Sequence, residues 1–138
     1  MAPAIPGTPA PIAAGTPPKY DLTNFNAAHQ ALTMTPQEQG LYMHHLGQTV
    51  APATNPDGAP ATVAPLNLQV GNMFHNIPTV WNRQALNWDD PAQRATLLGN
   101  IQKAGGFGRF PSYPSADAAD ARYAAMQNYM TRDMGRSR

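Results

Sequence analysis

Proline constrains this chain more than any other residue. Six of its 15 prolines lie within the first 18 positions, among alanine, glycine and threonine. Proline has no amide hydrogen to donate to a ladder, and such small side chains bury little apolar surface. We therefore predict that residues 1–19 form an extended arm outside the core, which leaves roughly 115 residues for one small domain.

Charge is scarce and unevenly distributed. Charged residues make up 12% of the chain, and its formal net charge is +1. Residues 1–70 contain one basic and three acidic residues, a net −2, whereas residues 71–138 contain eight basic and five acidic residues, a net +3. A weakly charged surface does not repel copies of the same chain, so self-association is favoured, and the alternative is a soluble monomer of low charge.

Three arginines gather at the C-terminus: Arg132, Arg136 and Arg138. They could contact the phosphates of DNA or the acidic groups of a partner chain. Domains that bind nucleic acid usually carry a much larger basic excess, so a specific DNA or RNA site is not favoured.

The sequence contains no cysteine, which excludes disulfides, thiolate nucleophiles and cysteine-ligated metal sites. The N-terminus has neither a basic start nor a continuous apolar stretch, so no signal peptide is predicted. No apolar run approaches the roughly 20 residues that a membrane-spanning helix needs. We expect the chain to be made in the cytoplasm and to have no membrane span.

Residues 20–50 are predicted to form a helical hairpin. Its first helix carries four side chains on one face, at the spacing i, i+3, i+4 and i+7: Phe25, Ala28, His29 and Leu32. Either Asp21 or Thr23 can cap the N-terminus of this helix.

The second helix of this hairpin has a strong start signal. Thr35, Pro36 and Glu38 have the spacing of a capping box with proline at its first helical position. The helix is expected to end at Gly47.

The chain then changes from a predicted linker, residues 51–62, to strands. Apolar and polar side chains alternate in residues 66–70 and again in residues 73–81, and Gly71–Asn72 between them suits a two-residue hairpin turn. Pro78 cannot donate to a ladder, so the second strand is expected to lie at a sheet edge or to carry a bulge there.

A third helix is predicted to begin at Pro91, capped by Asp90, and to end at Gly105 or Gly106. Its apolar stripe consists of Leu97, Leu98, Ile101 and Ala104.

The last helix is predicted to be capped by Ser115. A seam of four side chains follows at steps of four, three and four: Ala119, Tyr123, Met126 and Met130. We predict that its three larger members pack against Ile77, Trp81 and Leu98.

These elements predict an α+β fold that is mostly helical, with a small β-hairpin, about four short helices and an extended proline-rich N-terminal arm. The predicted organisation is an arm (1–19), a helical hairpin (20–50), a linker (51–62), a hairpin-helix-loop-helix module (63–134) and a basic tail (135–138).

No catalytic, cofactor-binding or metal site is predicted. The chain has four histidines: His29, His44, His45 and His75. None forms the i, i+4 pair that a metal site on a helix needs. The carboxylates of Glu38, Asp90 and Asp117 are explained by helix N-termini. The sequence contains no Gly-x-Ser-x-Gly elbow. We therefore expect that the protein is not an enzyme.

Four segments together resemble a small module found in virion-associated and injected proteins of tailed bacteriophages. These segments are NPDG (55–58), NIPTVW (76–81), FPSY (110–113) and ADARYAAMQNYMTRD (119–133). The resemblance covers about 80 residues in the C-terminal part of the chain. Where the module usually has Gly-Lys after the tryptophan, this chain has NRQAL (82–86), so that turn is expected to be built differently.

The resemblance implies a virion protein rather than an enzyme. Seven residues are expected to build the core of the module: Ile77, Trp81, Phe110, Tyr113, Tyr123, Met126 and Met130. The implied role is an internal ejection protein of a short-tailed phage, made in the host cytoplasm and assembled with copies of itself and other virion proteins. The alternatives are a fixed connector or decoration protein of the head or tail, and a non-catalytic module that binds nucleic acid or protein in the infected cell.

Overall fold

Residues 21–49, 51–55 and 57–136 are described by a computed structural model of the chain, and the predicted arm lies outside these residues. The helices described there are α1 (Thr23–Leu32), α2 (Pro36–Gln48), α3 (Pro91–Ala104) and α4 (Ala116–Arg136), with the 3-10 helix η1 at Phe107–Arg109. The strands are β1 (Ala53–Thr54), β2 (Pro60–Ala61), β3 (Leu66–Val70), β4 (Met73–Ile77), β5 (Val80–Trp81), β6 (Gln84–Ala85) and β7 (Ser112–Tyr113). Helices combined with small antiparallel sheets confirm the predicted α+β class.

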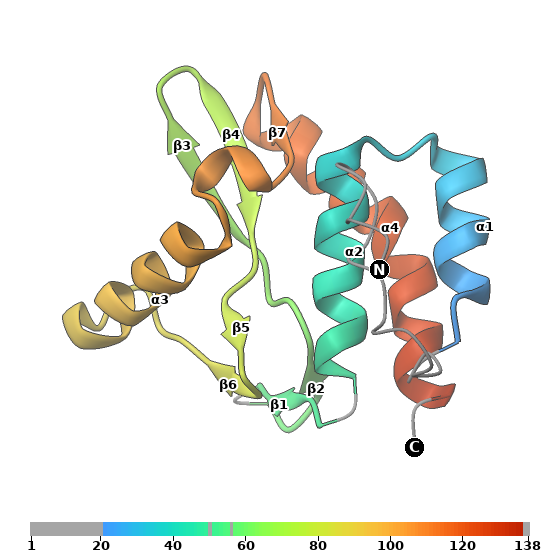
Figure 1. Cartoon of the computed structure of the whole chain (residues 1–138), viewed down its shortest axis with the longest axis horizontal. Coiled ribbons are helices and arrows are strands. Elements are labelled where there is room, and N and C mark those ends of the chain that lie inside the picture. Colours follow the sequence, from blue (N-terminus) through green and yellow to red (C-terminus); the bar gives the residue numbers. More distant parts are fainter. Residues whose placement is uncertain (1–20, 50, 56, 137–138) are drawn as a thin grey trace, which may run out of the picture.

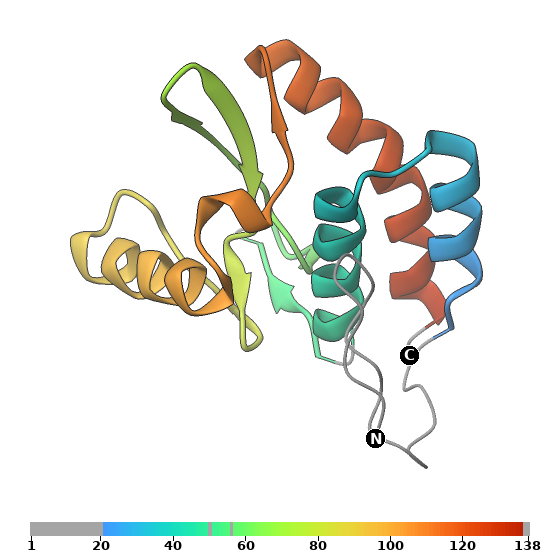
Figure 2. The ribbon, with the colours of Figure 1, turned by 45° about the horizontal axis from the view of Figure 1, so that its top comes forward.

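Helix α4 is the central element of the fold. It packs against α1 and α2 and also contacts β3, β4 and β7 (Figure 1). Helix α3 lies at the opposite end of the molecule from α1, as the turned view also shows (Figure 2). One hydrophobic core runs through these parts, because residues from α1, α2, β4, α3 and α4 belong to the same buried cluster.

Helix α1 buries a different face from the predicted one. Phe25 and Ala28 are buried, as their spacing predicts, but His29 is exposed and Asn24 is only 3% exposed. The prediction for His29 is therefore wrong. The polar Asn24 can be buried because its amide donates a hydrogen bond to a carboxylate of α4, and this tertiary contact decides the face.

Helix α2 begins with the predicted capping box. The Thr35 hydroxyl accepts a hydrogen bond from the Glu38 amide, and the Glu38 carboxylate accepts one from the Thr35 amide. The helix ends at Gln48, one residue beyond Gly47, the expected stop.

The segment predicted as a linker is folded against the rest of the domain. Strands β1 and β2 pair as a short antiparallel ladder, and the Asn55 amide donates to the carbonyl of Ala59 across the turn between them. Beyond this ladder, Thr62 and Val63 are buried, and the Val63 carbonyl accepts a hydrogen bond from Thr79. These bonds satisfy backbone groups that a free linker would leave to water.

Strands β3 and β4 form the predicted hairpin, but the predicted second strand, residues 73–81, is divided into β4 and β5, which belong to different sheets. Their register pairs Val70 with Met73 across a two-residue turn in which Gly71 has φ 63°, as a type II′ turn requires at its first central position. Strand β4 is the middle strand of the order β3-β4-β7, so the predicted edge position is wrong. Pro78 is nevertheless tolerated, because the ladder ends before it, at Ile77.

The turn after Trp81 consists of two residues with positive φ angles. Strands β5 and β6 pair through Trp81 and Gln84, and the two residues between them, Asn82 and Arg83, have φ 52° and 66°. Two successive positive φ angles are the mark of a type I′ turn, in which Asn-Gly is the favoured pair. An arginine at the second position is strained, because its Cβ crowds the backbone there.

Helix α3 has the predicted boundaries, with the Asp90 side chain accepting from the Ala92 amide and Gly105 in the left-handed conformation at its end. Leu97 and Ile101 are buried. Leu98 is 37% exposed and lies outside the core cluster, so its predicted contact with the last helix is wrong.

Helix α4 begins as predicted, with the Ser115 hydroxyl accepting from the Ala118 amide. Of its predicted seam, Ala119, Met126 and Met130 are buried and Tyr123 is partly buried. Of the other residues expected to build the core of the module, Ile77 and Phe110 are buried and Trp81 packs against the same cluster. Tyr113 is only partly buried and lies outside this cluster, so its predicted place in the core is wrong.

We predict that Arg83→Gly stabilises the domain by roughly 0.5–1 kcal/mol, because glycine adopts positive φ without steric cost. Equilibrium urea denaturation measures the change. Gln84→Gly, at the neighbouring strand position, is the matched control and should instead destabilise by a similar amount. Equal effects of the two glycines would contradict the type I′ assignment.

We also predict that Met126→Ala lowers the free energy of unfolding by about 2–4 kcal/mol, because the side chain is fully buried and leaves a cavity. Leu98→Ala, on the exposed side of α3, should cost less than about 1 kcal/mol. Denaturant titration of both variants checks the expected order. A loss below about 0.5 kcal/mol for Met126→Ala would show that the α4 seam contributes little to this core.

Candidate functional site

Two clusters of buried and partly buried polar side chains attach α4 to its neighbours in the described part of the chain. We call them the Glu38 cluster (Glu38, Tyr113, Arg122) and the Asp133 cluster (Asn24, Tyr42, His45, Thr62, Asp133). They contain the most distinctive polar geometry of the protein, and both lie against the core. These two clusters are therefore the first candidates for a functional site.

In the Glu38 cluster, one carboxylate accepts from two sequence-distant partners. Glu38 is 1% exposed, and its Oε2 lies 2.6 Å from Arg122 Nε and 2.6 Å from the Tyr113 hydroxyl. Arg122 Nη2 lies 3.1 Å from the other carboxylate oxygen and also donates to the carbonyl of Leu32, at the end of α1. The carboxylate that caps α2 therefore also binds α4 and β7.

The electrostatics of this cluster keep Glu38 ionised. Burial alone would raise the pKa of Glu38, but the hydrogen bonds from Arg122 and Tyr113 outweigh burial, and the pKa is lowered. The pKa of Tyr113 is raised by burial and by its hydrogen bond to the Glu38 carboxylate, so this hydroxyl stays a donor. The hydrogen bond to Glu38 raises the pKa of Arg122.

In the Asp133 cluster, a carboxylate near the end of α4 lies within hydrogen-bond distance of three side chains from two helices, α1 and α2. Asp133 Oδ2 lies 2.6 Å from the Tyr42 hydroxyl and 3.0 Å from His45 Nε2, and Oδ1 lies 3.0 Å from the amide of Asn24. The other ring nitrogen of His45, Nδ1, lies 2.5 Å from the hydroxyl of Thr62. The cluster thus joins α1, α2, α4 and the segment after β2.

The series Thr62–His45–Asp133 has the connectivity of a nucleophile, a base and an acid. A catalytic nucleophile must reach a substrate carbonyl next to oxyanion donors. Here the Thr62 side chain is 5% exposed, and His45 and Asp133 are 0% and 2% exposed. Tyr42 also occupies the same Asp133 oxygen as His45. This enclosure favours a structural role for the three residues.

The four histidines have different partners in the fold, and only His44 and His45 are neighbours, in α2. His29 is exposed and stacks on Phe25, whereas His44 Nε2 lies 2.7 Å from the carbonyl of Val80, and burial lowers the pKa of His44. His75 Nδ1 lies 3.3 Å from the carbonyl of Phe110. In the described residues, no three histidine, aspartate or glutamate side chains come together in a way that could hold a metal ion.

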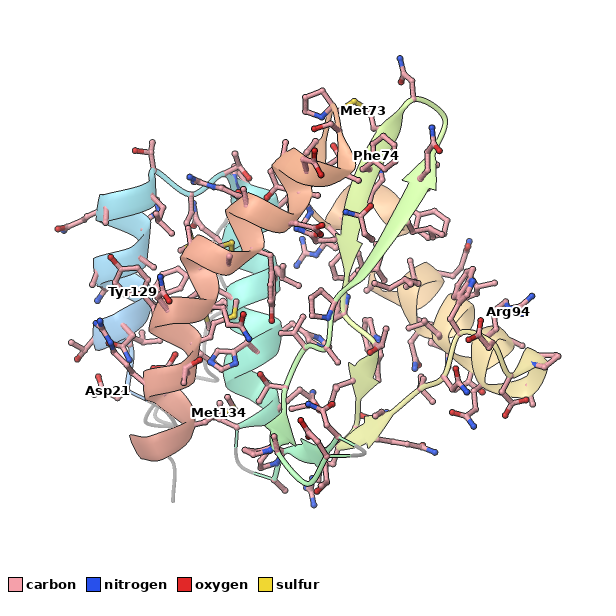
Figure 3. All side chains as sticks on the ribbon, turned by 180° about the vertical axis from the view of Figure 1, so that it is seen from behind. Asp21, Met73, Phe74, Arg94, Tyr129 and Met134 are labelled. Atoms are coloured by element: carbon pink, nitrogen blue, oxygen red, sulfur yellow. The ribbon has the colours of Figure 1, made fainter. Side chains whose placement is uncertain are left out.

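The C-terminal arginines are only partly placed. Arg132 is exposed, and its guanidinium lies 5.4 Å from the centre of the Tyr129 ring, a cation–π contact. In Figure 3, Tyr129 lies on the side of α4 that faces α1. Arg136 is the last residue of α4, so the predicted basic tail begins within this helix, and Arg138 lies outside the described residues.

Two shallow hollows lie along α4. One of about 80 Å³ lies between α4 and the segment that contains Thr62, and a second of about 140 Å³ lies between α4 and the strands β3 and β4. Tyr123 and Gln127 line both hollows, and burial raises the pKa of Tyr123 to about 12. Both hollows are smaller than the roughly 300–1,000 Å³ of ordinary small-molecule sites.

Sequence reasoning missed the two polar clusters. The local sequence explains Glu38 as a capping residue and indicates no partner for Arg122 or Asp133. A signal was present: Arg122 and Asp133 are 11 positions apart, about three helical turns, so they share the helix face that carries Met126 and Met130. Charged residues on a buried face need partners.

Comparison with known proteins found no matching family model, no similar curated protein and no similar solved structure. No helix among the described residues is both long and apolar enough to cross a membrane.

We predict that Glu38→Gln lowers the free energy of unfolding at neutral pH by about 1–3 kcal/mol, because Arg122 and Tyr113 lose a charged acceptor. The pKa of Glu38 is lowered in the folded state. Its ionised form therefore stabilises the fold above the unfolded-state pKa, and this contribution is lost as pH falls through the lowered folded-state pKa.

Chemical denaturation between pH 7 and pH 2 measures this difference. The wild-type chain should lose more stability than Glu38→Gln on acidification, so their curves converge at low pH. Asp117→Asn, which removes an exposed carboxylate in the first turn of α4, is the control and should change stability by less than about 1 kcal/mol. Parallel curves for wild type and Glu38→Gln would contradict the assigned role.

Proposed function

We propose that this protein is a non-catalytic structural protein of a tailed bacteriophage particle. In the sharper form of the proposal, it is an internal ejection protein that assembles with copies of itself and with other virion proteins to help deliver the genome. The proposal starts from the resemblance of four sequence segments to a module of virion-associated phage proteins.

The observation that carries the proposal is where the polar side chains of those segments point. Asn76, in the NIPTVW segment, donates its amide to the carbonyl of Ala119 in α4. Tyr113, in the FPSY segment, and Arg122, in α4, both donate to Glu38. Asp133, the last residue of the α4 segment, accepts from α1 and α2. An enzyme motif would direct some of these groups into an open site.

The same contacts connect three of the four segments in space. The Asn76 amide N–H donates to the carbonyl of Pro111, and Phe74 pairs with Tyr113, so the FPSY segment joins the sheet beside β4. Helix α4 then closes over both segments through the Asn76 side chain. In this chain, the polar residues of the matched segments hold the fold together instead of lining an open site. Such a protein is suited to a structural role in an assembly.

The composition supports a role among other proteins. Low charge allows close packing of copies. The absence of cysteine is compatible with a chain that must partly unfold to pass through a narrow channel. The alternatives are a fixed connector or decoration protein of the head or tail, and a binding module that acts in the infected cell.

Quantitative mass spectrometry of purified particles, before and after triggered genome release, tests the proposal. We expect the chain in intact particles and its loss together with the DNA. Retention in emptied particles would assign it to a fixed head or tail component. Absence from both samples would overturn the virion assignment and favour the intracellular binding module. Major capsid protein, measured in the same samples, is the control for particle recovery.

A further inference from the structure

We infer that the outer edge of β3 is a self-association surface on which β3 of a second copy pairs antiparallel, with Leu68 at the two-fold axis. This inference rests on the self-association included in the proposed function and names its surface. It is carried by the open edge of β3, by its hydrogen-bonding pattern and by its side chains.

Strand β3 is the outer strand of the order β3-β4-β7, and no described strand pairs with its other edge. That edge faces away from β4, β7 and α4 in both ribbon views (Figures 1 and 2). Strand β3 has five residues, whereas β7 at the opposite edge has two. It is therefore the long open edge of this sheet.

The outward backbone groups can be assigned from the register. A two-residue turn makes Val70 and Met73 a hydrogen-bonded pair, so the backbone groups of Asn67 and Gln69 point away from β4. The backbone N–H of Asn76, the residue paired with Asn67, donates to the carbonyl of Pro111 on the β7 side. This bond confirms that Asn67 and Asn76 form a non-hydrogen-bonded pair between β3 and β4. No described residue hydrogen-bonds to the outward backbone groups of Asn67 and Gln69.

Strand β3 lacks the features that normally protect an open edge. Its sequence LNLQV has no charged residue and no proline, and its five pairs with β4 run without a bulge. The hairpin end beyond it is apolar as well: Val70 is 38% exposed, and Figure 3 places Met73 and Phe74 near the tip. An uncharged, regular and partly apolar edge is a template for another strand.

The sequence of β3 is complementary to itself when two copies run antiparallel about Leu68. Asn67 of each copy then lies opposite Gln69 of the other, and these are the residues whose backbone groups point outward, so four hydrogen bonds form. Leu68 faces Leu68 in a non-hydrogen-bonded pair, and Leu66 faces Val70. The apolar side chains meet on one face of the joined sheet. Asn67 and Gln69 lie on the other face, where the Asn67 side-chain amide lies 3.4 Å from Asp120 Oδ1 of its own α4.

The two-fold axis can be tested with single cysteines, because the chain has none of its own. At the axis the two Cα atoms of residue 68 would lie about 4.5 Å apart, within the range of a disulfide. We expect full-length Leu68→Cys to form a disulfide-linked dimer under mild oxidation. Val70→Cys is the matched control, since it is on the same strand face but its two copies would lie about 14 Å apart.

Leu68→Cys should cross-link at least about tenfold faster than Val70→Cys, although Val70 is the more exposed side chain. Gln69→Pro gives a second reading that does not depend on cysteine, because it removes an outward amide hydrogen without breaking the ladder to β4. Its dimer dissociation constant, from sedimentation equilibrium, should rise about tenfold or more, whereas Gln69→Thr, which keeps the amide, should stay near wild type.

A wild-type chain that sediments as a monomer up to millimolar concentration would overturn the inference. So would equal cross-linking of the two cysteine variants, or equal dissociation constants for Gln69→Pro and Gln69→Thr. These outcomes are separate from the particle measurement. If Leu68→Cys cross-links but the chain is absent from particles, only the virion proposal is overturned. If the chain is present in particles but is monomeric in solution, only the β3 interface is overturned.

Discussion

The buried carboxylate of Glu38 ties together four elements that are distant in sequence. It closes the capping box of α2, accepts from Tyr113 of β7 and pairs with Arg122 of α4, which in turn donates to the end of α1. A carboxylate removed from water needs such partners, because burial without them costs several kcal/mol. Once Glu38 is satisfied in this way, the relative positions of α1, α2, β7 and α4 are determined.

A second buried carboxylate, that of Asp133, attaches the other end of α4 to its neighbours. Asp133 accepts from α1 and α2, about three turns after Arg122 and on the same face of the helix. Between these two polar anchors lie Met126 and Met130, which supply apolar contacts to the core. Apolar packing alone would tolerate a helix that slides or rotates, whereas two anchored charges allow one register.

The fold therefore places two polar clusters against its core and leaves the surface of the described residues sparsely charged. The charged residues that remain outside are few, and the strand at the open edge of the main sheet carries none. In an isolated soluble protein such an edge would favour unwanted pairing. In a protein that acts within an assembly, the same edge offers a specific contact, because backbone hydrogen bonds and alternating side chains select one register.

Local sequence signals determined the four helices and the β3–β4 hairpin. These signals are the capping box at Thr35, the caps at Asp90 and Ser115, the glycine stop after α3 and the two-residue turn at Gly71. Each depends on residues within one helical turn or one hairpin, so it can be interpreted without the fold. The α+β class followed from the same signals. The apolar seam of α4 was also visible, since helical spacing alone places its residues on one face.

Only the tertiary structure decided which polar residues are buried and which apolar ones are exposed. Asn24 replaces His29 on the inner face of α1, Leu98 faces solvent, and β4 becomes a central strand because a two-residue strand 35 positions later pairs with it. The partners of Glu38 and Asp133 are likewise far away in sequence. Burial and charge pairing depend on distances across the folded chain, and no local pattern of residue types specifies those distances.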